Sequence, residues 1–170
     1  MAFKICMIED DSDLAGLVKE YLERYDFEVS ICEDFKNIDK FVDGHGPDLI
    51  LLDINIPYFD GFYWCNEIRK ITRVPIIFTS ARTEDYDQVR AIMSGGDDYI
   101  TKPFLPMELL LRVKAVLRRI SRNTEKMSKI QLGEVEFSTD AGTVTRQNRV
   151  TSLTAKEYII LKKLVENYKK

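Results

Sequence analysis

Residues 48–54 read DLILLDI, an almost wholly apolar run that closes on the carboxylate of Asp53. Two similar runs are FKICMI at residues 3–8 and VPIIFTS at residues 74–80. Strands that are apolar at nearly every position, rather than at every second one, are typical of a parallel sheet covered on both faces. The three runs therefore predict the buried centre of an α/β sheet.

Amphipathic segments separate these runs and complete five strand-and-helix units. Strands are expected at residues 3–8, 27–32, 48–54, 74–80 and 98–101, and helices at residues 13–25, 35–44, 61–71, 85–96 and 107–120. This alternation predicts a five-stranded, parallel, doubly wound α/β domain of the flavodoxin-like type. The functional crevice of such a domain lies at the carboxyl ends of its strands.

The chain changes character after residue 120. Residues 121–129 have no apolar periodicity and are expected to form a linker. Short alternating runs separated by STDAG and RQNR then predict an antiparallel meander, followed by an amphipathic helix whose capping box is Thr154 and Glu157. The predicted organisation is one domain over residues 1–120, a linker over residues 121–129 and a smaller unit over residues 130–170.

Composition limits the partners and the compartment. Residues 1–120 carry 15 Lys and Arg against 22 Asp and Glu, and residues 121–170 carry 10 against 6. This distribution argues against a whole-molecule nucleic-acid or membrane binder and permits a small basic module in the second part. Free buried cysteines, no signal peptide and no run of ~20 apolar residues predict a soluble cytoplasmic protein. The cysteines are Cys6, Cys32 and Cys65.

Carboxylates gather at the expected carboxyl edge of the sheet. Glu9, Asp10 and Asp11 follow the first strand, and Asp53 ends the third, which is a near neighbour of the first in a doubly wound sheet. Clustered carboxylates repel one another unless they share a cation, and oxygen ligands with room for water suit Mg²⁺. Asp10 and Asp11 could instead only start the next helix. Asp53 favours the metal site, because an unpartnered carboxylate at the end of an apolar strand is costly.

A hydroxyl and a cation are expected at the same edge. Ser80 ends the fourth strand, and Lys102 follows the fifth. Lys102 taken alone could equally be a solvated surface charge. Together, however, a nucleophilic carboxylate, a metal site, a hydroxyl and a cation are the parts that phosphoryl transfer to a carboxylate requires.

Four motifs, in this order and spacing, resemble the receiver domain of bacterial two-component response regulators. They are IEDD at residues 8–11, LLDINIPYFDG at 51–61, TSA at 79–81 and DDYITKPF at 97–104. The resemblance covers residues 3 to about 120. It implies a protein that accepts a phosphoryl group from a sensor histidine kinase, not an enzyme beyond its own phosphorylation and slow dephosphorylation.

The resemblance also implies a role for each matching residue. Asp53 would be the phosphoacceptor, with Glu9 and Asp10 as the acid pair. Mg²⁺ would be held by Asp10, Asp53 and the main-chain carbonyl of Asn55. Ser80 and Lys102 would contact the phosphoryl group, and Tyr99 would be the aromatic switch.

Residues 95–119 and 152–167 are similar to the OmpR/PhoB type of regulator, whose effector is a winged-helix DNA-binding domain. This likeness implies a homodimer through the fourth helix, fifth strand and fifth helix, although an ordinary solvated face would carry similar charges. The matching charged positions are Asp97, Asp98, Glu108, Arg112 and Arg119. The recognition helix would follow Lys170, so promoter DNA binding is expected only of a full-length form. Residues 58–70 are also similar to regulators that respond to bacitracin and cationic peptides.

Two other classes of protein share parts of the pattern. A hydrolase with an aspartyl-phosphate intermediate carries Asp-x-Asp at the strand end, whereas residues 53–55 read DIN, and a cap domain is lacking. A flavin-binding module needs a loop rich in Ser, Thr and Gly after the first strand, whereas residues 9–13 read EDDSD, which would repel phosphate. The sequence therefore favours the receiver.

Overall fold

The computed structural model describes residues 2–138 and 142–168, apart from the side chains of residues 122–129, 166 and 168. The chain divides into two compact units, Met1–Leu117 and Arg118–Lys170. No helix of the described residues is long and apolar enough to cross a membrane.

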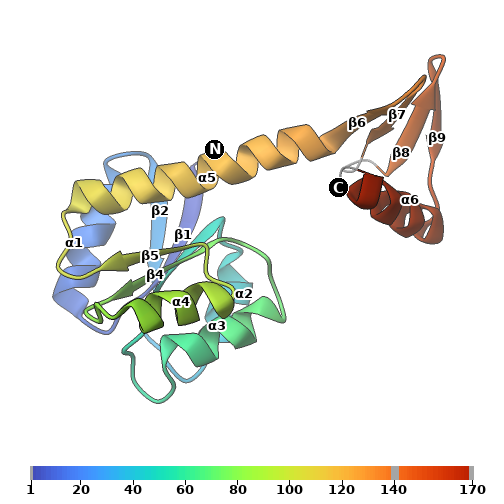
Figure 1. Ribbon diagram of the computed structural model, residues 1–170. Coiled ribbons are helices and arrows are strands. Elements are labelled where there is room, and N and C mark those ends of the chain that lie inside the picture. The colour runs from blue at the N-terminus through green and yellow to red at the C-terminus, as the bar shows by residue number, and fades with distance from the viewer. Residues whose placement is uncertain (1, 139–141, 169–170) are drawn as a thin grey trace. The chain divides into compact units, whose positions relative to one another are not determined.

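The first unit is built on a parallel sheet with the strand order β2-β1-β3-β4-β5 (Figure 1). Its strands are β1 Phe3–Ile8, β2 Phe27–Ile31, β3 Leu49–Asp53, β4 Ile76–Ser80 and β5 Asp98–Thr101. Its helices are α1 Ser12–Glu23, α2 Ile38–His45, α3 Gly61–Arg69, α4 Asp85–Met93 and α5 Pro106–Ser128. The predicted doubly wound α/β fold is therefore confirmed.

Two apolar layers cover the faces of this sheet. Side chains of α1 and α5 pack on one face, with Leu49, Leu51 and Ile77 from the strands. Side chains of α2, α3 and α4 pack on the other face, with Ile50 and Leu52. Successive residues of β3 thus point into opposite layers, and every residue of the strand is buried. This double burial is the reason that β3 is apolar throughout, except for Asp53 at its end.

All three cysteines are free and buried, as the sequence predicts. Burial raises the pKa of the Cys6 thiol to about 12 and the pKa values of Cys32 and Cys65 to about 11. The thiolate is the reactive form, so each rise of two pKa units lowers its population roughly a hundredfold. The thiols should therefore be inert in the native state.

We expect a thiol reagent at pH 8 to leave the native protein unlabelled within minutes and to label Cys6, Cys32 and Cys65 after denaturation, as counted by intact mass. A raised thiol pKa stabilises the fold at low pH and loses that contribution as pH rises from the unfolded value toward the folded one. Stability should accordingly fall above about pH 9. Rapid labelling of the native protein would contradict this assignment.

The second unit begins within α5 and contains an antiparallel sheet in the order β6-β7-β8-β9 followed by α6. The strands are β6 Lys129–Leu132, β7 Val135–Ser138, β8 Thr143–Arg146 and β9 Arg149–Ser152, and α6 is Ala155–Tyr168. The predicted meander and following helix are both present. The predicted capping box is also confirmed, because the Thr154 amide donates to Glu157 Oε2 at 2.7 Å and the Glu157 amide donates to Thr154 Oγ1 at 3.3 Å.

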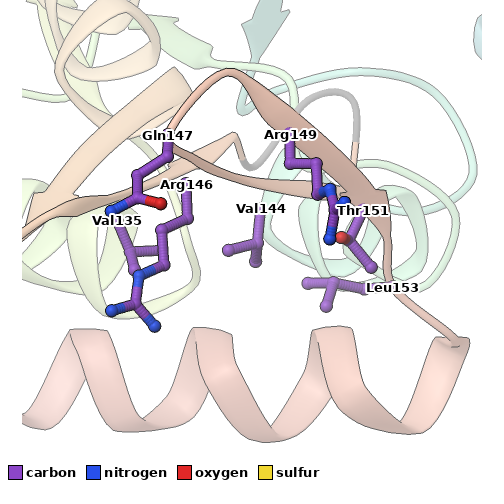
Figure 2. Close-up of a pocket in the computed structure, with 7 residues that line it drawn as sticks. All are labelled: Val135, Val144, Arg146, Gln147, Arg149, Thr151 and Leu153. Atoms are coloured by element: carbon purple, nitrogen blue, oxygen red, sulfur yellow. The ribbon is translucent and has the colours of Figure 1, made fainter.

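The core of the second unit is small. Ile130, Phe137 and Val165 are its buried members, whereas Ile159, Ile160 and Leu164 are exposed on α6. An open pocket of about 950 Å³ lies on the strand side that faces α6 (Figure 2). Its lining residues are Val135, Val144, Arg146, Gln147, Arg149, Thr151 and Leu153, none of which is a predicted site residue.

Helix α5 extends beyond its expected end. The segment predicted as a linker, residues 121–129, is helical up to Ser128 and then enters β6 at Lys129. Apolar periodicity indicates the packing of a helix rather than its formation, so its absence did not exclude a helix here. Its role as a connection between two domains stays a prediction.

Candidate functional site

Carboxylates converge at the carboxyl end of the parallel sheet. Asp53 is the last residue of β3, and Glu9 directly follows β1, the neighbouring strand. Glu9, Asp10 and Asp53 each place an oxygen atom within 4.8 Å of the others. Asp53 and Glu9 are buried, at 4% and 3% exposure, and Asp10 is exposed. The structure therefore brings together three of the four acidic residues that the sequence singled out.

Asp11 does not join this cluster. It is the N-cap of α1, and its carboxylate accepts hydrogen bonds from the amides of Asp13 and Leu14, both at 3.1 Å. Helix initiation was one interpretation of both Asp10 and Asp11, and it holds for Asp11. Asp10 is left for the acidic cluster.

Lys102 is the cation of the site rather than a solvated charge. Its ammonium donates to Glu9 Oε2 at 2.6 Å and to Asp53 Oδ2 at 2.9 Å, and its side chain is 18% exposed. Burial lowers the pKa of Lys102, but the hydrogen bonds to the two carboxylates outweigh it and raise the pKa above its ordinary value. Burial also raises the pKa of Glu9, which the Lys102 hydrogen bond only partly opposes.

Ser80 and Tyr99 lie side by side behind this cluster. Ser80 is fully buried at the end of β4, and its hydroxyl accepts from the Arg82 amide at 3.0 Å. The Tyr99 ring is turned inward at 8% exposure, and its hydroxyl donates to the Arg82 carbonyl at 2.7 Å. Burial raises the pKa of Tyr99, with an opposing contribution from its hydrogen bond with Ser80.

Asn55 lies in the loop that follows Asp53. Its amide donates to Asp53 Oδ1 at 3.1 Å, which folds the loop back over the strand end. Its side-chain oxygen accepts from the Arg82 guanidinium. Arg82 was not predicted as a site residue, because nothing in the sequence around an arginine two residues after a strand identifies its partner.

The donor set of the cluster fits a hard divalent cation. Asp10 and Asp53 offer carboxylate oxygens, and the exposure of Asp10 leaves room for water. Three carboxylates against the single charge of Lys102 leave an excess of negative charge, which a Mg²⁺ ion would neutralise. The carbonyl of Asn55 is the third ligand that the family resemblance implies.

The predicted dimer residues already make contacts within one chain. Asp97 Oδ2 accepts from the Ile76 amide at 2.9 Å and from Arg69 at 3.2 Å. Asp98 pairs with Arg112 at 3.0 Å, and Arg112 lies 3.6 Å from Glu108. Arg119 is exposed on α5. Large apolar side chains are also exposed, on α4 at Tyr86, Val89, Ile92 and Met93 and on α5 at Leu111.

The parallel fold with a buried carboxylate, an acidic cluster and a lysine at its carboxyl edge is that of a receiver. A family model described as "Response regulator receiver domain" matches residues 5–114. The chain belongs to this family.

Three known proteins illustrate the relationship. The chain is 41% identical to the "Uncharacterized transcriptional regulatory protein YvcP" of Bacillus subtilis, over 99% of this chain and 73% of YvcP. The N-terminal domain of NsrR, a lantibiotic response regulator for nisin resistance, has 41% identity and a TM-score of 0.64, covering 69% of this chain and all of that domain. DrrB, a Thermotoga maritima OmpR/PhoB homolog, has 28% identity and a TM-score of 0.63, covering 98% of this chain and 74% of DrrB. The predicted OmpR/PhoB resemblance is confirmed.

Proposed function

We propose that this receiver accepts a phosphoryl group on Asp53 from a sensor histidine kinase. The observation that carries the proposal is the buried Asp53 carboxylate, which closes an apolar strand and lies 2.9 Å from the Lys102 ammonium. An oxygen of Asp53 attacks the phosphorus atom of the phosphohistidine, the phosphorus–nitrogen bond breaks, and the released histidine takes up a proton.

The neighbours of Asp53 have distinct roles in this step. Asp10, Asp53 and the Asn55 carbonyl would hold Mg²⁺, which neutralises charge on the transferred group when bound. The Lys102 ammonium contacts the phosphoryl oxygens, and the Ser80 hydroxyl donates a hydrogen bond to one of them. Glu9, with Asp10, completes the acidic set and orients Lys102 at 2.6 Å.

The switch follows from the added charge. Phosphorylation adds about −1.5 to −2 charges at Asp53, and this charge draws the Ser80 hydroxyl toward the new oxygens. Tyr99 occupies the space beside Ser80, where its ring is already buried. Phosphorylation thus favours an inward state that the free protein also adopts, which is a population shift.

The output is pairing of two receivers through α4, β5 and α5, and promoter binding in a full-length form. The charged residues of this face would be Asp97, Asp98, Glu108, Arg112 and Arg119, and Tyr86, Val89, Ile92 and Met93 on α4 and Leu111 on α5 are exposed apolar side chains. The meander and α6 would be the first part of a winged-helix effector. The similarity to a nisin resistance regulator supports a peptide antibiotic as the stimulus. A cytoplasmic location is part of the same proposal.

The direct test is incubation with acetyl phosphate and Mg²⁺, followed by intact mass and size-exclusion measurement. We expect a gain of about 80 Da, the mass of one phosphoryl group, and a shift toward dimer. Asp53→Asn should abolish both, whereas Asp43→Asn, an exposed acid on α2, should keep both. A mass gain that survives Asp53→Asn, or no gain in the native sequence, would sink the proposal.

A further inference from the structure

Arg82 lies in the loop between β4 and α4 and contacts elements on both sides. Its Nε and Nη2 atoms donate to Asn55 Oδ1 at 3.1 and 2.8 Å, and Nη1 donates to Asp87 Oδ1 at 3.4 Å. Its backbone is held as well, because its amide donates to Ser80 Oγ and its carbonyl accepts from Tyr99. Arg82 is therefore held by hydrogen bonds to four residues, namely Asn55, Ser80, Asp87 and Tyr99.

These contacts restrain Asn55. Asn55 is an exposed residue, and among the described residues its hydrogen bonds are these two from Arg82 and the one from its own amide to Asp53 Oδ1. A guanidinium is a planar, rigid fork, and here two of its N–H groups converge on one side-chain oxygen. Ordering a loop before a ligand binds removes part of the entropic cost of binding.

We propose that Arg82 is a positioning residue for the metal site. It holds the Asn55 loop so that the Asn55 carbonyl is already in place for the divalent cation. This inference rests on the proposed function, since it concerns the metal that the acidic cluster would bind.

Electrostatics alone predicts the opposite effect of Arg82 on the affinity for Mg²⁺. A positive charge beside an acidic cluster repels a divalent cation, so its removal should tighten metal binding. Positioning predicts that its removal weakens metal binding, because the loop is freed. The direction of change therefore separates the two effects.

The test is titration of the whole chain with MgCl₂ alone in a calorimeter, without a phosphodonor. We expect Arg82→Gln to raise the Mg²⁺ dissociation constant roughly three- to tenfold, the range for losing one ordinary intramolecular hydrogen bond. Lys36→Gln is the matched control for charge, because Lys36 is a cation at the same end of the sheet that lies over the Tyr58 ring, 4.8 Å away. It should leave the constant unchanged or slightly lower it.

A double-mutant cycle makes the test specific to the Arg82–Asn55 contact. Asn55→Ala should weaken Mg²⁺ binding to a similar extent and still reports on the contact if Arg82→Gln misfolds. The double variant should bind no more weakly than the weaker single variant. An unchanged or tighter constant in Arg82→Gln, or fully additive effects, would overturn the inference. If the native sequence binds Mg²⁺ but gains no mass from acetyl phosphate, the proposed function fails and the role of Arg82 stands.

Discussion

Replacing Gly61 with alanine is expected to destabilise the receiver by about 3 kcal/mol, the size typical of forcing an extra carbon into a filled site. A Cβ atom on Gly61 would lie 2.5 Å from the Asp53 carbonyl oxygen and 2.8 Å from the Ile54 Cα. Both are backbone atoms at the end of β3, so no side chain can move aside. The start of α3 must therefore shift away from the phosphoacceptor strand, and the hydrogen bond from the Gly61 amide to the Ile54 carbonyl, 2.8 Å long, is strained or lost.

Urea unfolding followed by tryptophan fluorescence measures this effect. Trp64 is the one tryptophan of the sequence, and it is buried in α3, so the signal reports on the receiver alone. Gly16→Ala is the matched control, because a Cβ atom there meets nothing within 4 Å on α1. It should stabilise the protein by about 0.5–1 kcal/mol through helix propensity. Equal unfolding midpoints for Gly61→Ala and the native sequence would contradict the close approach.

Sequence reasoning could predict the sheet and the acidic cluster because each depends on local pattern. An apolar run such as β3 has no other stable place than between two helical layers, and Asp53 at its end then has to find a partner. Asp10 and Lys102 follow from the same rule, since carboxyl ends of parallel strands share one edge. The residues at the carboxyl ends of the strands were therefore enough to predict the chemistry of the site.

Contacts that depend on side-chain direction could not be predicted in this way. Arg69 donates to the Gly95 carbonyl at 2.7 Å and to the Val74 carbonyl at 2.6 Å, which ties the end of α3 to the loop before β5 and to the loop that follows α3. The pattern placed Arg69 only on a helix, and it placed Arg82 only in a loop. A guanidinium reaches several positions from its backbone, so packing of the whole fold decides its partner.

Replacing Lys102 with methionine is expected to slow phosphorylation by acetyl phosphate roughly a hundredfold, the usual size for removing one preorganised charge from a transition state. Methionine keeps the apolar stem but not the ammonium, which lies 2.9 Å from Asp53 Oδ2. The charge on the transferred phosphoryl oxygens then lacks its cation. The control variant is Lys114→Met. Lys114 lies on α5, and its exposed ammonium is 5.3 Å from the Tyr25 ring. This variant should keep the native rate.

The same variant should change how stability depends on pH. In the native protein burial raises the pKa of Glu9, and the hydrogen bond from Lys102 lowers it, so losing Lys102 raises the pKa of Glu9 further. A carboxyl group whose pKa is raised on folding stabilises the fold at low pH, and this contribution is lost as pH rises through the folded pKa. Lys102→Met should thus lose stability relative to the native protein as pH rises above the ordinary range of a glutamate carboxyl, and Mg²⁺ should restore part of it. A native phosphorylation rate, or a parallel pH profile of stability, would show that Lys102 does not neutralise the carboxylates around Asp53.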